Sequence, residues 1–260
     1  MKKYAIGLLS LIGWVSLEIS AAELDRVAVE QRLAKADATH LADLRRKDLT
    51  DLDLSNLDFR HADLWGSDLR RSNLNHSDLS GLNLDLTVMT KINLSGANLA
   101  NTSIFGVHMA SANLSKANLT GSRFIANLDK SDLSQADLSH ANWGVDMQNQ
   151  PMGLMRVSLN SVNLTGANLT EANLNRALMR FANLSDAKLT RAVLFGIDFS
   201  GANLANADLS GADLSACLFE DTNFSGANLD GTVFSANIDK SKLKGLAQSK
   251  NLDKAIFKAD

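Results

Sequence analysis

A large apolar residue recurs at every fifth position of this chain, from Leu44 almost to the C-terminus. These repeat centres occupy positions 44–124, 128–143 and 154–234 in steps of five, followed by positions 238 and 243. All 40 centres are Leu, Ile, Met, Phe or Trp. The residue two before each centre is small or apolar in every repeat except at Lys47, and the residue between them is usually Asp or Asn. Few backbone conformations can use a repeat of this length.

A five-residue period suits neither an α-helix nor a straight strand. Five residues of helix turn through about 500°, so the centres would scatter around the axis instead of forming a stripe. In a straight strand an odd period places successive centres on opposite faces. The chain must therefore bend once per repeat, always in the same sense. The centre and the residue two before it then both face inward, because alternate strand residues share a side.

The repeated tripeptides Ala42-Asp43-Leu44, Ala97-Asn98-Leu99 and Ala212-Asp213-Leu214 resemble the A-(D/N)-L-x-x motif of the pentapeptide-repeat proteins. The resemblance extends from Ala42 to Leu243. It implies an all-β fold, a right-handed parallel β-helix of square cross-section with four repeats per coil. About ten coils would make a rod ~48 Å long, because each coil rises by the spacing between strands.

The first 22 residues are predicted to be a signal peptide, and the mature protein to begin near Glu23. Lys2 and Lys3 precede an apolar run from Tyr4 to Leu17, and Ser20-Ala21-Ala22 supplies the small residues of a cleavage site. The run is too short to span a bilayer comfortably, so we expect no stable membrane span after cleavage. The predicted location is periplasmic or secreted. An uncleaved anchor or a buried terminal helix is the alternative.

The remaining chain divides into a helical N-terminal cap (23–41), two halves of the β-helix (42–143 and 154–243) and a C-terminal cap (244–260). Between the halves, Gly144–Gly153 interrupts the repeat and contains the only proline, Pro151, which has no N–H to donate to the next coil. The segment is therefore predicted to be a loop. In some relatives such loops contact the partner, whereas a tolerated insertion is the simpler interpretation.

The sequence contains no catalytic or metal-binding motif. The five histidines are predicted to lie on the surface, and none is paired at a helical metal-ligand spacing. Cys217 occupies a repeat position that usually holds Ala, Ser or Thr, which indicates a small buried side chain. No enzyme activity, cofactor or metal is therefore expected. The net charge of −3 argues against nucleic-acid binding, which requires a basic surface.

Exposed apolar residues suggest an interaction surface. Residues 20 apart should stack on one face, which would align Trp65, Leu86, Phe105 and Ile125 in an exposed strip ~15 Å long. We expect this strip, together with Met147 and Pro151 in the loop, to contact an unknown protein partner or a second copy in a homodimer. Scattered surface hydrophobic residues are the alternative.

Two functions follow from these features. The leading prediction is a non-catalytic interaction or scaffold protein of the cell envelope. The alternative is an acidic rod that mimics DNA and modulates a type II topoisomerase such as gyrase, as some pentapeptide-repeat proteins do. Between Asp43 and Asn83 the outward position is Asp in seven of nine repeats, but later repeats mostly carry Asn there. A signal peptide would also separate the protein from cytoplasmic targets.

Overall fold

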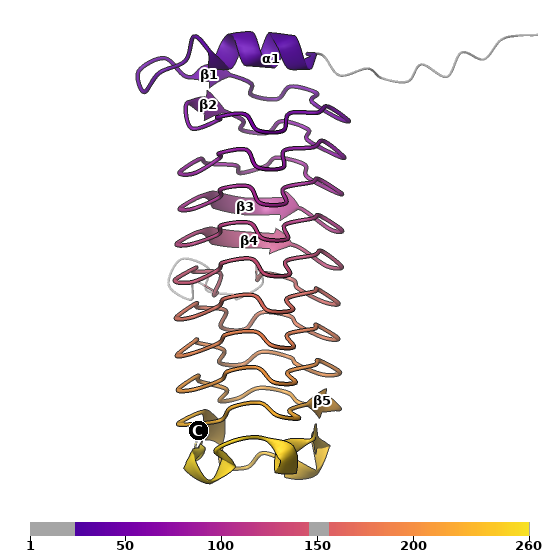
Figure 1. Ribbon diagram of the computed structural model, residues 1–260, viewed down its shortest axis with the longest axis vertical. Helices are drawn as coiled ribbons and strands as arrows, with labels where there is room; N and C mark the ends of the chain where they lie inside the picture. The colour runs from indigo at the N-terminus through magenta and orange to yellow at the C-terminus, as the bar shows by residue number, and fades with distance from the viewer. Residues whose placement is uncertain (1–23, 146–155, 260) are drawn as a thin grey trace, which may run out of the picture.

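The computed structural model describes residues 24–145 and 156–259, which form a single stack of coils with α1 at one end (Figure 1). The proposed signal peptide lies outside this range. The described elements are α1 (Arg26–Leu33), β1 (Ala42–Asp43), β2 (Ala62–Asp63), β3 (Ser103–His108), β4 (Arg123–Asn127), β5 (Thr222–Asn223), β6 (Val233–Ser235), η1 (Lys240–Lys242), β7 (Leu243–Lys244), η2 (Leu246–Gln248), η3 (Leu252–Lys254) and β8 (Ile256–Lys258).

Backbone pairing between coils is parallel and follows a fixed offset. Ala42 pairs with Ala62, and Asp48 pairs with Asp68, so 20 residues, or four repeats, complete one turn. Most repeats contribute a single bridging residue, because the chain bends again before a longer strand can form. The predicted parallel β-solenoid of about ten turns is confirmed.

The repeat centres fill the interior in four columns. Column 1 holds the centres Leu44, Leu64, Leu84, Ile104, Phe124, Trp143, Leu174, Leu194, Leu214 and Phe234, all buried. Columns 2, 3 and 4 are the stacks that begin at Leu49, Leu54 and Phe59. Burial of this apolar interior is the main source of stability, at ~25 cal/mol for each Å² removed from water.

Each bend is made by the two residues after a centre, and the second of them adopts a left-handed conformation. Leu86 has φ +60° and Gly96 has φ +63°. Glycine suits such positions because it has no Cβ to clash. At Gly96 a Cβ would also lie 2.6 Å from the ring of His76 in the preceding coil, so stacking limits side-chain size as well.

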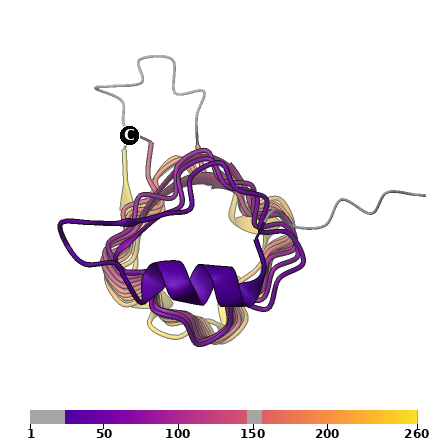
Figure 2. The same cartoon turned by 90° about the horizontal axis from the view of Figure 1, so that it is seen from above.

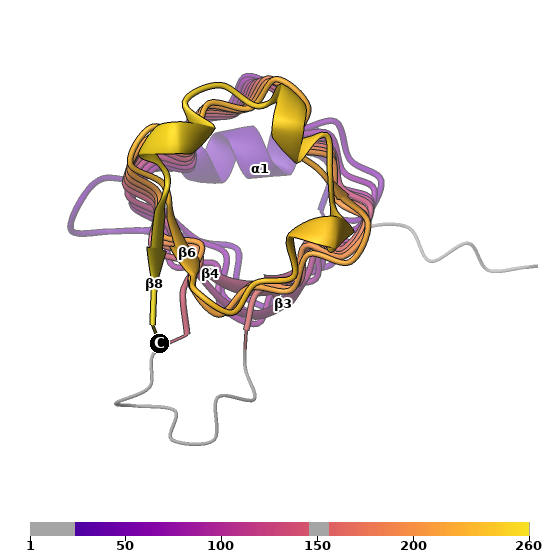
Figure 3. The ribbon, with the colours of Figure 1, turned by 90° about the horizontal axis from the view of Figure 1, so that it is seen from below.

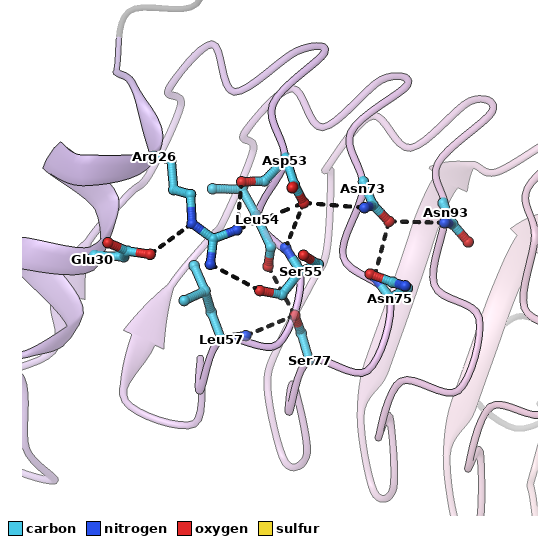
Figure 4. A network of polar contacts seen from close by, with 10 residues as sticks. All are labelled: Arg26, Glu30, Asp53, Leu54, Ser55, Leu57, Asn73, Asn75, Ser77 and Asn93. Carbon is cyan, nitrogen blue, oxygen red and sulfur yellow. Dashed lines mark hydrogen bonds and ion pairs between the residues drawn. The ribbon is translucent and has the colours of Figure 1, made fainter.

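The outward Asp or Asn of each repeat fixes both the bend and the stacking. The Oδ1 atom of Asp53 accepts hydrogen bonds from the backbone N–H of Ser55 (3.1 Å) and from Nδ2 of Asn73 one coil on (3.1 Å). Asn93 in turn donates to Asn73 over 2.8 Å (Figure 4). The predicted outward position of these residues is confirmed, since Asp53 is exposed and Asn73 is half-buried. Their side chains also form polar ladders that run along the rod, which the sequence analysis did not predict.

Two irregularities change the stacking offset. The step from Phe124 to Leu128 is one residue short, and the pairing of β3 with β4 shifts by one residue between Phe105 and Val107. The interruption after Trp143 then raises the offset to 31, since Asn142 pairs with Asn173.

The offset of 31 reduces the number of repeats between Trp143 and Leu174 from the five counted in the sequence to four. If Leu154 were a centre, Leu169 would stack on Trp143. The structure places Leu174 there instead, because Asn142 pairs with Asn173. Leu154 itself lies outside the described residues.

At the N-terminal end, α1 lies across the mouth of the first coil (Figure 2). Asp25 begins the helix by accepting a hydrogen bond from the N–H of Ala28, and Val29 is fully buried. Arg26 donates to the exposed carbonyls of Asp53 (3.0 Å) and Ser55 (3.1 Å), which have no preceding coil to pair with (Figure 4). Two carbonyl groups at this open strand edge are thereby satisfied.

The opposite end of the rod carries short elements that follow the outline of the last coil (Figure 3). The helices η1, η2 and η3 lie over the last coil. Strand β8 pairs beside β6 in parallel, with Phe234 opposite Phe257 (Figure 3). The rings of Phe234 and Phe257 stack with centroids 5.4 Å apart, so the apolar column continues into the C-terminal segment.

Leu114 tests the buried columns. Leu114→Ala should lower the free energy of unfolding by about 2–5 kcal/mol, because the side chain is fully buried and leaves a cavity. Lys116→Asn, an exposed change in the next bend that tolerates the left-handed φ of +59°, should shift it by less than about 0.5 kcal/mol. Denaturant unfolding measures both, and similar losses in the two variants would contradict the assignment of inside and outside.

Candidate interaction surface

Outward apolar side chains gather where the chain bends from column 1 to column 2. We call the bend residues 45–46, 65–66, 85–86, 105–106, 175–176 and 195–196 the first edge. Leu86 is 52% exposed and Phe105 is 37% exposed, and Trp65 is half-buried. These three residues lie on successive coils at the same bend, as expected. The N–H of Leu86, for example, donates to the carbonyl of Phe105 on the next coil.

The first edge repeats one local arrangement. A long side chain at the left-handed position covers the glycine of the next coil and approaches the aromatic ring beside it. Arg46 lies 4.9 Å from the centroid of Trp65, and Arg176 lies 5.6 Å from that of Phe195. Leu86 covers Gly106 in the same way. The rings are thus held in place by neighbours rather than being free to collapse onto the rod.

The prediction that Ile125 is exposed is wrong. Ile125 is only 5% exposed, because the shortened bend after Phe124 lets β4 continue through this corner with three successive residues buried. The exposed strip therefore ends at Phe105. Met147 and Pro151, the loop residues predicted to contact a partner, lie outside the described residues.

The interrupted repeat is also located at the first edge. Trp143 belongs to column 1 and Leu159 to column 2, so the interruption falls between these two columns. Val145 and Arg156, the described residues that flank the interruption, consequently lie on the same corner as Phe105 and Phe195.

The sequence analysis missed several outward apolar residues in the second half. Phe195 joins the first edge, and Val193, at 39% exposure, lies beside it on column 1. Leu218 on column 2 is 60% exposed. Their places on the rod follow only from the offset of 31 across the interruption. Without that offset, the columns of the second half cannot be matched to those of the first.

Columns 3 and 4 present a different surface. Their outward residues are mostly Asn and Asp, linked from coil to coil through side-chain amides. Examples are Asn118 donating to Asn98 (3.1 Å) and Asn223 donating to Asn203 (3.0 Å). Because these groups already bond to one another, this side of the rod offers few unused polar atoms and little apolar area.

The stacked carboxylates of the first coils are neutralised by arginines. Arg45 lies 2.9 Å from Asp43 and 3.5 Å from Asp63 one coil on. Arg60 bridges Asp58 and Asp78 similarly, at 2.6 and 3.7 Å. Each arginine thus offsets the repulsion between two stacked carboxylates, and the negative potential of this region is lower than its aspartate count suggests.

No cluster in the described part of the chain has the form of a metal centre: no group of three or more His, Cys, Asp or Glu side chains converges there. Cys217 is half-buried and donates its S–H to the carbonyl of Leu194 (3.0 Å). Burial raises the pKa of this thiol to about 12, so the nucleophilic thiolate is scarcely populated near neutral pH. Cys217 has the packing role that its repeat position predicts.

The Arg–Asp bridges predict a pH dependence. The hydrogen bond from Arg45 lowers the pKa of Asp43 to about 2, below the unfolded value of about 3.9, and Arg60 lowers the pKa of Asp58. Their stabilisation is therefore complete above about pH 4 and is lost as pH falls toward 2. An Arg45→Gln/Arg60→Gln variant should melt below the parent at pH 6, and the gap in Tm should close by pH 2. A gap that stays constant over this range would show that the bridges do not stabilise the fold.

The repeat of this chain is also found in known proteins. The family model described as "Pentapeptide repeats" matches residues 53–90, 89–125, 158–194 and 197–235 in 8 copies. No curated protein matches the chain. Among the segments that the structure describes, no helix has the length and apolar character needed to cross a membrane.

Solved structures give the same result. HetL, a pentapeptide repeat protein involved in heterocyst differentiation regulation from the cyanobacterium Nostoc sp. strain PCC 7120, is 30% identical over 90% of this chain and 94% of its own, with a TM-score of 0.49. QnrB1, a plasmid-mediated fluoroquinolone resistance protein, is 18% identical over 72% of this chain and 89% of its own, with a TM-score of 0.50, and shows the fold alone. The family model matches more than half of the chain, and the chain therefore belongs to the pentapeptide-repeat family.

Proposed function

We propose that this protein is a non-catalytic interaction or scaffold protein of the cell envelope, which contacts a protein partner through the first edge. The observation that carries the proposal is the unequal distribution of outward apolar residues. They collect around columns 1 and 2, whereas columns 3 and 4 are occupied by amide ladders. Exposed apolar area concentrated on one side of a rigid body is typical of an interaction surface.

The rigidity of the rod supports this function. A backbone hydrogen bond from Leu86 to Phe105 fixes these two positions relative to each other, so the backbone loses little conformational freedom when a partner covers them. The interrupted repeat joins the rod at the same edge, so Met147 and Pro151 would reach the same partner. The right-handed, square form implied by the family resemblance and a capping role for α1 are part of this proposal.

A periplasmic or secreted location is also proposed, on the pattern of the first 22 residues. The sequence there combines a cationic start, an apolar run and a small-residue cleavage site. In that compartment Cys217, the only cysteine, has no partner for an intramolecular disulfide, which is consistent with a fold stabilised by packing.

The interaction function is favoured over the DNA mimic. A protein that imitates duplex DNA must present uncompensated negative charge at regular intervals. Here the stacked carboxylates Asp43, Asp63, Asp58 and Asp78 are each bridged by Arg45 or Arg60. The later ladders consist largely of neutral asparagine, so the acidic character fades along the rod.

Capture experiments test the first edge. The double variant Leu86→Ser/Phe105→Ser should lose most of the partner that the parent protein retains from the envelope fraction, because it removes the exposed apolar contact without altering the core. The matched control is Phe181→Ser, which removes an exposed ring (62%) from the bend between columns 2 and 3. Quantitative mass spectrometry of the captured proteins is the measurement.

The same variants distinguish a second copy from another protein. Light scattering of the purified parent and double variant reports whether the first edge joins two copies. Equal capture and an equal oligomeric state for the parent and the double variant would exclude the first edge as the contact surface.

A further inference from the structure

A shallow groove of about 480 Å³ crosses the outer surface of column 1 near the N-terminal end of the rod. Its lining includes Leu41, Arg45, Arg60, Asp63, Trp65 and Asn83. Trp65 forms one side, and Asp63 and Asn83 are consecutive outward residues of column 1. The groove is separate from the exposed side chains of Leu86 and Phe105, which are not part of its lining.

Asn83, in this groove, does not form the side-chain bond to the preceding coil that asparagines of columns 3 and 4 form. Asn73 donates from Nδ2 to Asp53, and Asn98 donates from Nδ2 to Asp78, each to the preceding coil. Asn83 occupies the equivalent position above Asp63, but its only hydrogen bond within the described chain is the one that its Oδ1 accepts from the N–H of Asp85 (2.8 Å). The amide group of Asn83 is exposed and retains two unused donors.

The two arginines that border the groove also retain donors. Arg60 and Arg45 bind Asp58 and Asp43 through Nε and Nη2. Nη1 of each guanidinium takes part in no hydrogen bond within residues 24–145 and 156–259. Because the carboxylates fix both planes, these donors are pre-oriented, which reduces the entropy lost when a ligand binds.

Trp65 supplies an apolar platform beside these polar groups. The guanidinium of Arg46 lies 4.9 Å from the centroid of the indole ring, in a cation–π contact. The ring is half-buried and lines the groove. An indole platform next to planar amide and guanidinium donors and carboxylate acceptors matches a pyranose ring, which has an apolar C–H face and a rim of hydroxyls that both donate and accept.

Charge distinguishes among ligand classes. Each arginine at the groove already faces two carboxylates, Arg45 with Asp43 and Asp63, so an anionic ligand would meet repulsion as well as attraction. A cationic ligand would have to displace an arginine from its carboxylates. A neutral ligand that exchanges hydrogen bonds with fixed donors and acceptors meets neither cost. We propose that this groove is a binding site for a neutral oligosaccharide.

Titration with defined tetrasaccharides tests the proposal on the full chain. Cellotetraose, chitotetraose and maltotetraose are the neutral probes, and tetragalacturonate is the anionic one. At least one neutral probe should bind and change the fluorescence of Trp65, with calorimetry giving the Kd. The change should be absent from Trp65→Ala, which separates it from the signals of Trp14 and of the fully buried Trp143. Trp65→Ala and Asn83→Ala should each weaken binding roughly tenfold, equivalent to about 1.4 kcal/mol.

Two matched variants control for loss of the fold. Phe195→Ala removes the ring that occupies the same bend under Arg176, and Asn142→Ala removes an exposed outward asparagine of column 1 outside the groove. Both should bind the probe like the parent, and all four variants should melt cooperatively. The proposal is overturned if no neutral probe binds, if only tetragalacturonate binds, or if Trp65→Ala and Asn83→Ala bind as tightly as the controls. Arg45 and Trp65 belong to the first edge as well as to the groove, so the contact with a protein partner is tested separately through Leu86 and Phe105, which do not line the groove.

Discussion

Hydrogen bonds between coils impose the constraint on which the rest of this structure depends. The N–H of Leu54 donates to the carbonyl of Asn73 (2.7 Å), and the N–H of Leu74 donates to that of Asn93 (2.7 Å), one coil further on. A chain that bends every fifth residue cannot satisfy its peptide groups within a coil, so each coil needs a neighbour in exact register. That register places the centres above one another, and the apolar columns follow from it.

The same constraint determines which side chains remain available for function. Centres and the small residues before them are fixed by the interior, and most outward asparagines are fixed by the ladders. Variation is therefore confined to the bends and to the few outward positions that leave the ladder, such as Asn83, Val193 and Leu218. Both proposed surfaces use such positions. The first edge uses apolar bend residues, and the groove uses Asn83 beside Trp65.

Most of the fold could be predicted from the sequence, because the five-residue period admits only one kind of bend. The inward and outward positions followed from the period, whereas the parallel register and the number of repeats per turn were implied by the resemblance to the pentapeptide-repeat proteins. Ile125 was misplaced because a fixed step of 20 ignores the missing residue between Phe124 and Leu128. Phe195 was missed because Leu154 was counted as a centre, which displaced the columns of the second half. The local period was visible in the sequence, whereas the offset across an interruption is set by pairing between distant residues.

The ladders and the groove were harder to foresee. Asparagine and aspartate look alike as outward polar residues, but only asparagine can donate to the coil before it. Whether Asn83 does so depends on side-chain geometry that the repeat pattern does not contain. The arginine bridges posed the same difficulty, since the sequence showed aspartates and arginines in the same coils without showing that one arginine serves two carboxylates.

Engineered disulfides test the stacking most directly. In a Cys217→Ser background, Asn98→Cys/Asn118→Cys pairs residues that bridge neighbouring coils, where the Cα atoms of adjacent strands lie within the range that a disulfide spans. Asn98→Cys/Asn113→Cys pairs residues that are closer in sequence but belong to different columns. Mass spectrometry after mild oxidation should find an intramolecular disulfide in the first variant only. Equal oxidation of both pairs, or oxidation of the second alone, would contradict a turn of four repeats.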